Sequence, residues 1–459
     1  MRETRALRLA TAALFTVLAL YGLSTLPDLA ARWGLTGGSF AVIAVWGALA
    51  TVGIARLRER PGASGLVLLC AVMLALRVGA AWIGAGRVSP GDPQSYRVLA
   101  QGLLAGRGLV LYEPYFGSDW RALFPPAYPV VLAAWSAVLG FSTASLLALG
   151  TLTDLATAAS IAKLGARLGD APAGRRAAWL YVVWPSVLFS APLAQKESLC
   201  ALLIVLLALA WLTPRAGWRG AVALGVPAGL LALTQPGEAP LAALFGIVLL
   251  ARSGWGPMVL FGLRGAMVAV VVLLPWWVRN WTLFHTFVPL TSASGASLWI
   301  GNNPAATGNW EPPPPALKGL PELTYNARIK AIALEWIEHH PAAFLRLTAT
   351  KLVRATGIGV FGVVRLEAMH PSIPRALAAL LWPVAQLAQI ALLGATAIRQ
   401  GRLPLALLLL IAACVLQWVL FGVWFEFGER HRECATPFLL LALCWAIDRQ
   451  TVEKQPPNP

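Results

Sequence analysis

Charged residues are scarce in this sequence. Asp, Glu, Lys and Arg together make up 12% of the 459 residues, about half of the roughly 25% found in ordinary soluble domains. Hydrophobic residues make up 58%, which is enough for roughly a dozen membrane crossings of about 20 residues each. The composition therefore excludes a soluble enzyme and leaves no room for a separate globular domain of useful size.

Acidic residues are fewer than basic ones, with 20 Asp and Glu against 36 Lys and Arg, which gives a net charge of +16. In membrane proteins with many spans, Lys and Arg gather in cytoplasmic loops and fix the orientation of the helices. The polar segments contain no basic stripe with interleaved aromatic residues of the kind that binds nucleic acid. We therefore interpret the excess as an orientation signal and predict no nucleic-acid partner.

Metal-binding patterns are also missing. The adjacent His339 and His340 end an expected helix from about Leu323 to His340, so their side chains point to different faces, which disfavours a metal site. The sequence has no CxxC pair, and its five cysteines lie in or beside apolar runs, where we interpret them as small apolar residues: Cys70, Cys200, Cys414, Cys434 and Cys444.

Apolar runs define the expected fold, an all-α membrane protein with about 12 transmembrane helices. The first run follows Arg2, Arg5 and Arg8 without an A-x-A cleavage site before the next span, so we predict a retained helix. The predicted spans are 6–26, 37–55, 65–84, 143–162, 177–193, 197–213, 218–234, 237–251, 257–278, 374–397, 403–424 and 434–448.

Two further runs, 126–140 and 343–361, are ambiguous. If both lie in the membrane interface, all the basic clusters fall on one side, which is the cytoplasmic side. Both termini are then expected in the cytoplasm, and the polar segments 85–125 and 279–342 face outward. The expected divisions of the chain are 1–64, the first two helices; 65–278, a transmembrane core with the first outward loop 85–125; 279–342, an outward loop with a surface helix; and 343–459, an interfacial helix and the last spans.

The first outward segment holds three carboxylates just above the membrane: Asp92, Glu113 and Asp119. A long, ordered loop directly after a span is more typical of an enzyme acting on a membrane-anchored substrate than of a transporter. Asp92 follows a Pro-Gly turn and precedes an expected helix through Leu104. Spacing alone leaves open that Asp92 only caps this helix.

The other outward segments add cations. Arg279 follows the span that ends in PWWVRN, and the Gly-, Asn- and Pro-rich stretch after it predicts a structured loop without a helix. The last hairpin places Arg430, His431 and Arg432 on the outward side, against the positive-inside tendency, which marks them as functional candidates. The guanidinium groups of the two arginines suit a lipid phosphate. A cluster of Arg and Glu that merely fixes the turn remains an alternative.

Several motifs in order, between Gly65 and Ala446, resemble one family. The sequence is similar to the GT-C glycosyltransferases that use polyprenyl-phosphate sugars, often called family 39, which contains protein O-mannosyltransferases and lipid A aminoarabinose transferases. It departs from them at Pro93, where a second acid is usual, and at Gln235, where an arginine is common. The motifs are Asp92, Tyr96, Ala100, Gly106 and Gly108; Pro125, Pro126, Tyr128 and Pro129; PWWVRNW followed by the pattern from Gly295 to Gly308; and Arg430-His431-Arg432 followed by Pro437-Phe438.

The resemblance implies a GT-C bundle that transfers a sugar from a polyprenyl (undecaprenyl) monophosphate to an acceptor hydroxyl, with inversion. It also implies that the protein lies in the bacterial cytoplasmic (inner) membrane with its active site facing the periplasm. The loop 85–125 is then the expected catalytic loop, and the two helices of 1–64 lie outside the core shared with the family. Asp92 is the expected base, accompanied by Glu197, and no cofactor or metal is required. The residues expected to bind the donor phosphate are Arg279, Arg430, Arg432 and Lys196. The expected substrate-loop residues are Tyr96, Glu113, Asp119, Tyr128, Asn302 and Asn303.

Two alternatives remain open. An oligosaccharyltransferase or glycan ligase would use a polyprenyl diphosphate donor, often together with a divalent metal. A lipid or solute transporter would show inverted repeats or paired broken helices, and we find no such symmetry. The sequence does not identify the sugar, the glycan, lipid or protein acceptor, the oligomeric state, or the role of the first two helices.

Overall fold

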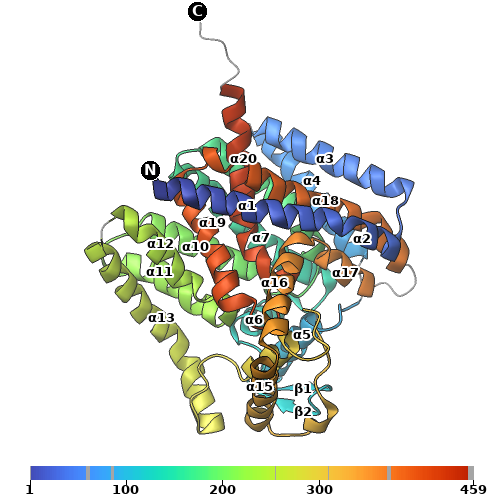
Figure 1. Ribbon diagram of the computed structural model, residues 1–459, viewed down its shortest axis with the longest axis vertical. Coiled ribbons are helices and arrows are strands. Elements are labelled where there is room, and N and C mark those ends of the chain that lie inside the picture. The colour runs from blue at the N-terminus through green and yellow to red at the C-terminus, as the bar shows by residue number, and fades with distance from the viewer. Residues whose placement is uncertain are drawn as a thin grey trace, which may run out of the picture.

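The computed structural model describes residues 2–57, 63–83, 87–253, 255–308, 310–369 and 374–452. The described chain is mostly helical, with a small antiparallel hairpin of strands β1 (Leu111–Glu113) and β2 (Ser118–Trp120) in the first outward segment. The α-helices are α1 (Arg2–Ser24), α2 (Leu26–Trp33), α3 (Gly37–Arg56), α4 (Ala63–Ile83), α5 (Asp92–Leu104), α6 (Ala127–Leu139), α7 (Thr143–Leu168), α8 (Ala171–Val183), α9 (Pro185–Ser190), α10 (Glu197–Leu212), α11 (Gly217–Ala232), α12 (Leu241–Ser253), α13 (Trp255–Phe284), α14 (Ser294–Gly301), α15 (Glu322–His339), α16 (Pro341–Gly357), α17 (Phe361–Ala368), α18 (Pro374–Ile398), α19 (Leu405–Gln417) and α20 (Thr436–Val452) (Figure 1).

The largest core lies where α8, α10, α19 and α20 meet. Ile204 and Leu207 of α10, Leu410 of α19 and Phe438 of α20 are fully buried there. Helices α10 and α19 are apolar on nearly all faces, which is the pattern of a helix surrounded by other helices or by lipid. Burial of these side chains therefore holds the centre of the bundle together.

Six helical stretches among the described residues are long and apolar enough to cross a membrane. Others are shorter, such as α10 with 16 residues and α12 with 13, so the count of about 12 spans stays a prediction. The six stretches are Thr4–Trp33, Gly37–Arg56, Thr143–Leu168, Trp255–Phe284, Arg375–Ile398 and Leu405–Gly422. The residues after 452, which follow the predicted last span 434–448, lie outside the described residues.

Neither ambiguous run forms a straight spanning helix. The run 126–140 becomes α6, whose 13 residues rise about 20 Å, less than the roughly 30 Å of the hydrocarbon core. The run 343–361 falls on α16 and the break before α17, and these two helices meet at a bend of 79°. The bent pair could also cross the membrane as one broken span, so the expectation that these runs lie in the interface stays a prediction.

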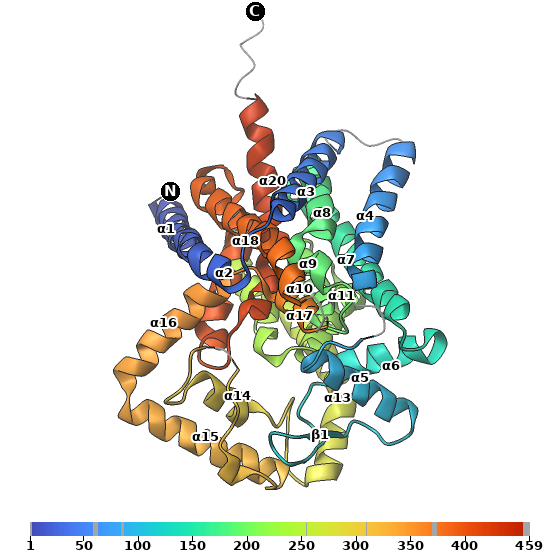
Figure 2. The ribbon, with the colours of Figure 1, turned by 90° about the vertical axis from the view of Figure 1, so that its right-hand side faces the viewer.

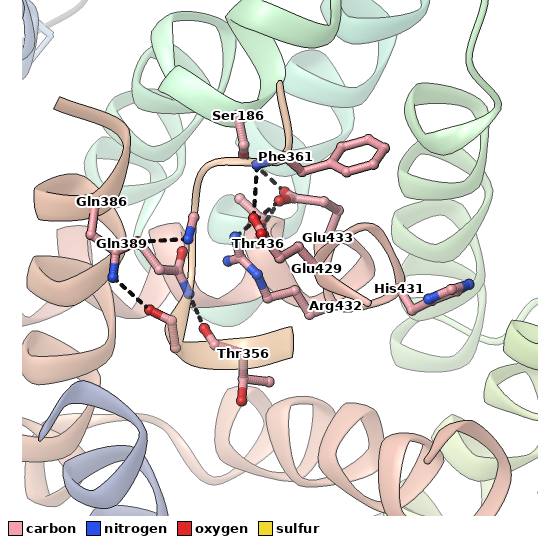
Figure 3. Close-up of polar contacts among 12 residues, drawn as sticks. Ser186, Thr356, Phe361, Gln386, Gln389, Glu429, His431, Arg432, Glu433 and Thr436 are labelled. Atoms are coloured by element: carbon pink, nitrogen blue, oxygen red, sulfur yellow. Dashed lines mark hydrogen bonds and ion pairs between the residues drawn. The ribbon is translucent and has the colours of Figure 1, made fainter. Parts of the chain in front are cut away.

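Two glutamines of α18 stabilise the break between α16 and α17. The Oε1 atom of Gln386 accepts a hydrogen bond from the amide of Gly359 (2.8 Å), and its Nε2 atom donates to the carbonyls of Gly357 and Gly22 (both 3.0 Å). Gln389 donates to the carbonyl of Thr356 (2.7 Å; Figure 3). These bonds satisfy backbone groups that the break frees in apolar surroundings. Because Gly22 belongs to α1, they also attach the first helix to the bundle.

Replacing Gln386 by Leu is expected to lower the stability of the fold by about 3 kcal/mol, because buried backbone groups lose their partners. The side chain of Gln386 is fully buried. Thermal unfolding of the detergent-solubilised protein, followed by tryptophan fluorescence, measures the effect. Gln101→Leu, on an exposed position of α5, is the matched control. An equal unfolding temperature for the two variants would contradict this role.

The two outward segments pack together at one end of the molecule. In Figure 2, α5, α6, α14, α15 and the hairpin gather at this end, away from the C-terminal part of α20. The expected helix from about Leu323 to His340 is confirmed as α15. The expectation of a loop without a helix before it was wrong, because residues Ser294–Gly301 form α14. Burial of Leu298, Trp299 and Ile300 explains this helix, since it provides packing that the Gly- and Asn-rich composition does not reveal.

Glu322, at the start of α15, joins the two segments. Its carboxylate accepts hydrogen bonds from the amides of Arg121 (2.7 Å) and Ala122 (2.8 Å) and from the hydroxyl of Ser292. The Glu322 side chain is buried. The second outward segment therefore fixes the end of the first, close to the Pro125–Pro126 turn that leads into α6.

Replacing Glu322 by Ala is expected to cost about 3 kcal/mol of stability, because three donors lose a charged acceptor. The loop 105–125 should also become more accessible to limited proteolysis. Glu335→Ala, at an exposed position of the same helix, should change neither property. Resistance of the Glu322 variant to protease at the wild-type level would argue against this linkage.

Candidate functional site

Asp92 begins α5 but does not cap it. The N-cap is Gly91, and no side chain caps this helix end. Gly91 has a φ of +81°, a conformation that favours glycine, and a Cβ atom there would lie 3.1 Å from Nη1 of Arg365. Pro93 fits the first helical turn, where its missing N–H costs nothing. The possibility that Asp92 is only a cap is therefore wrong, since its carboxylate is directed at another partner.

That partner is Arg430, in the short 3-10 helix Glu429–Ala435. The Nη1 atom of Arg430 pairs with Oδ2 of Asp92, and its Nη2 atom lies 3.3 Å from Oε1 of Glu426. The side chains of Arg430 and Asp92 are 15% and 21% exposed. The pair thus joins the first and last outward segments and remains within reach of a ligand.

Two more cations face Asp92. Arg365 of α17 donates to the carbonyl of Pro90 (2.7 Å), which holds its guanidinium beside Gly91. Lys196 precedes α10 and is 8% exposed. Burial alone would raise the pKa of Asp92, but the charges of Arg430, Lys196 and Arg365 outweigh it and lower this pKa below its usual value. The carboxylate is therefore ionised at neutral pH.

Tyr96 lies close to both Asp92 and Lys196. It lies one turn after Asp92 on the same face of α5, is 1% exposed, and makes edge contacts with Phe124 (5.1 Å) and Tyr128 (5.0 Å). The Nζ atom of Lys196 lies 5.9 Å from the centre of the Tyr96 ring. Burial, followed by the charges of Asp92 and Glu197, raises the pKa of Tyr96 well above its usual value, so the phenol stays protonated.

The other predicted acids are Glu197, Glu113 and Asp119, and each has different surroundings. Glu197 follows Lys196 and lines a small cavity of about 30 Å³ together with Ser186 and Glu433. Glu113 ends β1, and burial, with a smaller contribution from the charge of Asp92, raises its pKa. Asp119 lies in β2 opposite Tyr112, with its side chain exposed.

Arg279 does not join the cation cluster around Asp92. It lies inside α13, which continues to Phe284 and so extends beyond the predicted end of the span. Its guanidinium donates to the carbonyls of Leu109 (3.3 Å) and Arg121 (3.0 Å), and to Oδ1 of Asn280 (2.8 Å). In this structure Arg279 holds the backbone of the first outward segment.

The side chain of Arg432 contacts a different set of residues from that of Arg430. It is 4% exposed, and its Nη2 atom lies 3.4 Å from Oε1 of Glu433. Figure 3 shows it beside Glu429 and Glu433, whereas His431 points away from them. Burial and the charges of Arg430 and Lys196 lower the pKa of His431 well below its usual value. Its imidazole is therefore neutral, and its Nδ1 atom accepts a bond from the amide of Gly428 (3.0 Å).

Asn302 and Asn303 occupy buried structural positions. Asn302 donates to the carbonyls of Leu298 (2.8 Å) and Trp424 (2.7 Å), and Asn303 donates to that of Trp299 (2.9 Å). Their side chains are 0% and 3% exposed. The buried Nζ atom of Lys351 donates to Oδ1 of Asn302 (3.2 Å). Through these contacts, both asparagines fix the backbone at the end of α14.

The structure therefore brings together six of the predicted residues: Asp92, Tyr96, Tyr128, Lys196, Glu197 and Arg430. Two residues of the same cluster, Arg365 and Glu426, were missed. Glu426 lies in the hairpin that the sequence singles out, so its nearness to Arg430 was a usable signal. Nothing in the sequence distinguishes Arg365 from arginines that orient helices. Within the described ranges, His, Cys, Asp and Glu form no group of three suited to a metal ion.

Comparison with known proteins finds no matching family and no matching curated protein. Solved structures that are similar to this chain include two oligosaccharyltransferases. One is the oligosaccharyltransferase AglB from the archaeon Archaeoglobus fulgidus, in complex with an inhibitory peptide and a dolichol-phosphate (13% identity over 84% of this chain and 52% of that one, TM-score 0.45). The other is an Archaeoglobus fulgidus oligosaccharyltransferase in the apo form (14% identity over 83% and 51%, TM-score 0.46). The chain spans about half the length of these two proteins, so their ligands and activity are properties of those proteins.

Proposed function

We propose that this protein is a membrane glycosyltransferase of the GT-C type. It would transfer a sugar from a polyprenyl (undecaprenyl) monophosphate to an acceptor hydroxyl on the periplasmic side of the bacterial cytoplasmic membrane. The observation that carries the proposal is an ionised, partly exposed carboxylate, Asp92, surrounded by Arg430, Lys196 and Arg365. The cluster lies among the outward segments, beside helices suited to a membrane.

This arrangement supplies what the reaction needs. The acceptor oxygen would attack the anomeric carbon of the sugar from the side opposite the phosphate, which inverts the configuration. The carbon–oxygen bond to the phosphate breaks, and its electron pair leaves with the phosphate oxygen. The proton of the acceptor hydroxyl passes to a carboxylate oxygen of Asp92. Because a phosphate monoester leaves as a stable anion, the reaction needs cations for it and no general acid.

Arg430 links donor binding to the strength of the base. It is shared between Asp92 and Glu426, and while paired it makes Asp92 a weak base. An arriving phosphate competes for the guanidinium, in a bidentate geometry that suits arginine. The carboxylate then loses part of its compensating charge, so its pKa rises towards the range in which it accepts a proton. Lys196 and Arg365 would share the phosphate charge.

Release of free lipid phosphate tests the proposal. The purified protein is incubated with a panel of undecaprenyl-phosphate sugars and a membrane extract that supplies acceptors. Undecaprenyl phosphate should appear with at least one donor, and only when both acceptor and intact protein are present. Absence of release across the whole panel would count against the proposal and favour a transporter. A repeat with chelator separates the monophosphate reaction, expected to continue, from a metal-assisted diphosphate reaction.

A further inference from the structure

A second cationic site lies beside α5, away from the Asp92 carboxylate. A cavity of about 440 Å³ is lined by Arg87, Arg97, Phe141 and the first residues of α7. Arg97 follows Asp92 on α5 by an offset of roughly 140° around the helix, at about 100° per residue. Its side chain therefore leaves α5 on a different face from Asp92 and Tyr96, and the mechanism above does not use it.

The two arginines carry charge that no carboxylate neutralises within the described ranges. In that part of the chain neither Arg87 nor Arg97 forms an ion pair with a described carboxylate, whereas Arg77, Arg430 and Arg432 do. Arg97 lies over the ring of Phe141, with its guanidinium carbon 5.5 Å from the ring centre. This contact holds the cation at the cavity wall without consuming its hydrogen-bond donors.

The rest of the cavity wall also favours a ligand with a negative charge. Ser142 caps α7, a helix of 26 residues. The hydroxyl of Ser142 accepts a hydrogen bond from the backbone amide of Ser145 (3.1 Å). The helix therefore directs its positive end at the cavity, next to two guanidinium groups. Beside Phe141, the end of α6 exposes Val138 (82%) and Leu139 (52%). Apolar side chains this exposed, on a chain suited to a membrane, offer a surface for acyl chains.

We propose that this cavity binds a phosphate group, separately from the Asp92 site. The guanidinium groups of Arg87 and Arg97 would hold the phosphate oxygens, and the first turn of α7 would face the same oxygens. The phosphate belongs either to a lipid headgroup, whose chains would lie along Val138 and Leu139, or to a free phosphate. Both sources present the same anionic group to the two arginines.

Binding measurements on the full-length protein in neutral detergent test this site without any turnover. Isothermal titration uses dioctanoyl phosphatidate, inorganic phosphate and, as an uncharged lipid, dioctanoylglycerol. Phosphatidate should bind the wild type at least about tenfold more tightly than the double variant Arg87→Gln/Arg97→Gln, because charge-assisted hydrogen bonds are lost. Inorganic phosphate with the same dependence would identify a free phosphate as sufficient, and binding of phosphatidate alone would identify a lipid headgroup.

The double variant Arg107→Gln/Arg328→Gln is the control, because it removes the same charge from exposed positions elsewhere on the outward layer. It should keep the wild-type affinity. Equal losses in both double variants would show general attraction between charges and would overturn the proposal. Equal affinity of wild type and the Arg87/Arg97 variant, or equal binding of dioctanoylglycerol, would overturn it as well. A failure here would leave the proposed transferase reaction untouched, since neither arginine takes part in it.

Discussion

Asp92→Asn is expected to lower the rate of sugar transfer by about 10²- to 10⁴-fold, the usual contribution of a positioned base. The amide has the same shape as the carboxylate but cannot accept the acceptor's proton. Because the change also frees Arg430 from its ion pair with Asp92, the donor should bind as well as in the wild type or more tightly. The expected result is therefore a fall in kcat with an unchanged or lower KM for the donor.

Single-turnover release of lipid phosphate, together with direct donor binding, measures both effects. Glu338→Gln, an exposed carboxylate on α15, makes the same chemical change away from the site and should keep full activity. Tryptophan fluorescence and size-exclusion profiles establish that the Asp92 variant is folded. If the folded variant still turns over at a rate near that of the wild type, Asp92 is not the base.

Arg430→Gln is expected to reduce transfer by about 10²- to 10³-fold, the typical cost of losing one stabilising group for a developing negative charge. It should also change the pH dependence. The charge of Arg430 is the largest of those that lower the pKa of Asp92, so removing it raises that pKa. Activity on acidification is lost as the carboxylate becomes protonated, so the acidic limb of the pH–rate profile should move to higher pH.

Two further variants separate charge from geometry. Arg430→Lys keeps the positive charge but loses the two-pronged donor arrangement, so it should restore most of the pH profile and only part of the rate. Arg328→Gln, exposed on α15, should behave like the wild type. An acidic limb that stays in place in Arg430→Gln would show that the ion pair does not control the carboxylate, whatever happens to the rate.

The local residue pattern of Asp92 and its helix was predictable. A Pro-Gly turn followed by Asp92-Pro93 indicates the start of a helix, and α5 does begin at Asp92 and end at Leu104. Tyr96 one turn later must share the face of Asp92, because helix geometry leaves no other choice. The hairpin with Arg430 was singled out because its charges oppose the usual orientation rule.

The arrangement of the cations could not be predicted in the same way. Arg279 and Arg432 looked equivalent to Arg430 in the sequence, but Arg279 donates to loop carbonyls and Arg432 pairs with Glu433. Arg365 reaches Pro90 only because α16 and α17 meet at a sharp bend that Gln386 stabilises. Hydrogen bonds between residues so far apart in the chain leave no periodic pattern in the sequence.

The sequence by itself determined that the chain is helical and apolar and that its outward segments carry the unusual charges, because hydrophobic runs and charge placement act locally along the chain. Only the tertiary structure decided which of those charges meet. An ion pair such as Asp92–Arg430 depends on two segments far apart in the chain coming together, and buried links such as Glu322 fix the loops near one of them. Packing selects these partners through distance and desolvation, which composition does not encode.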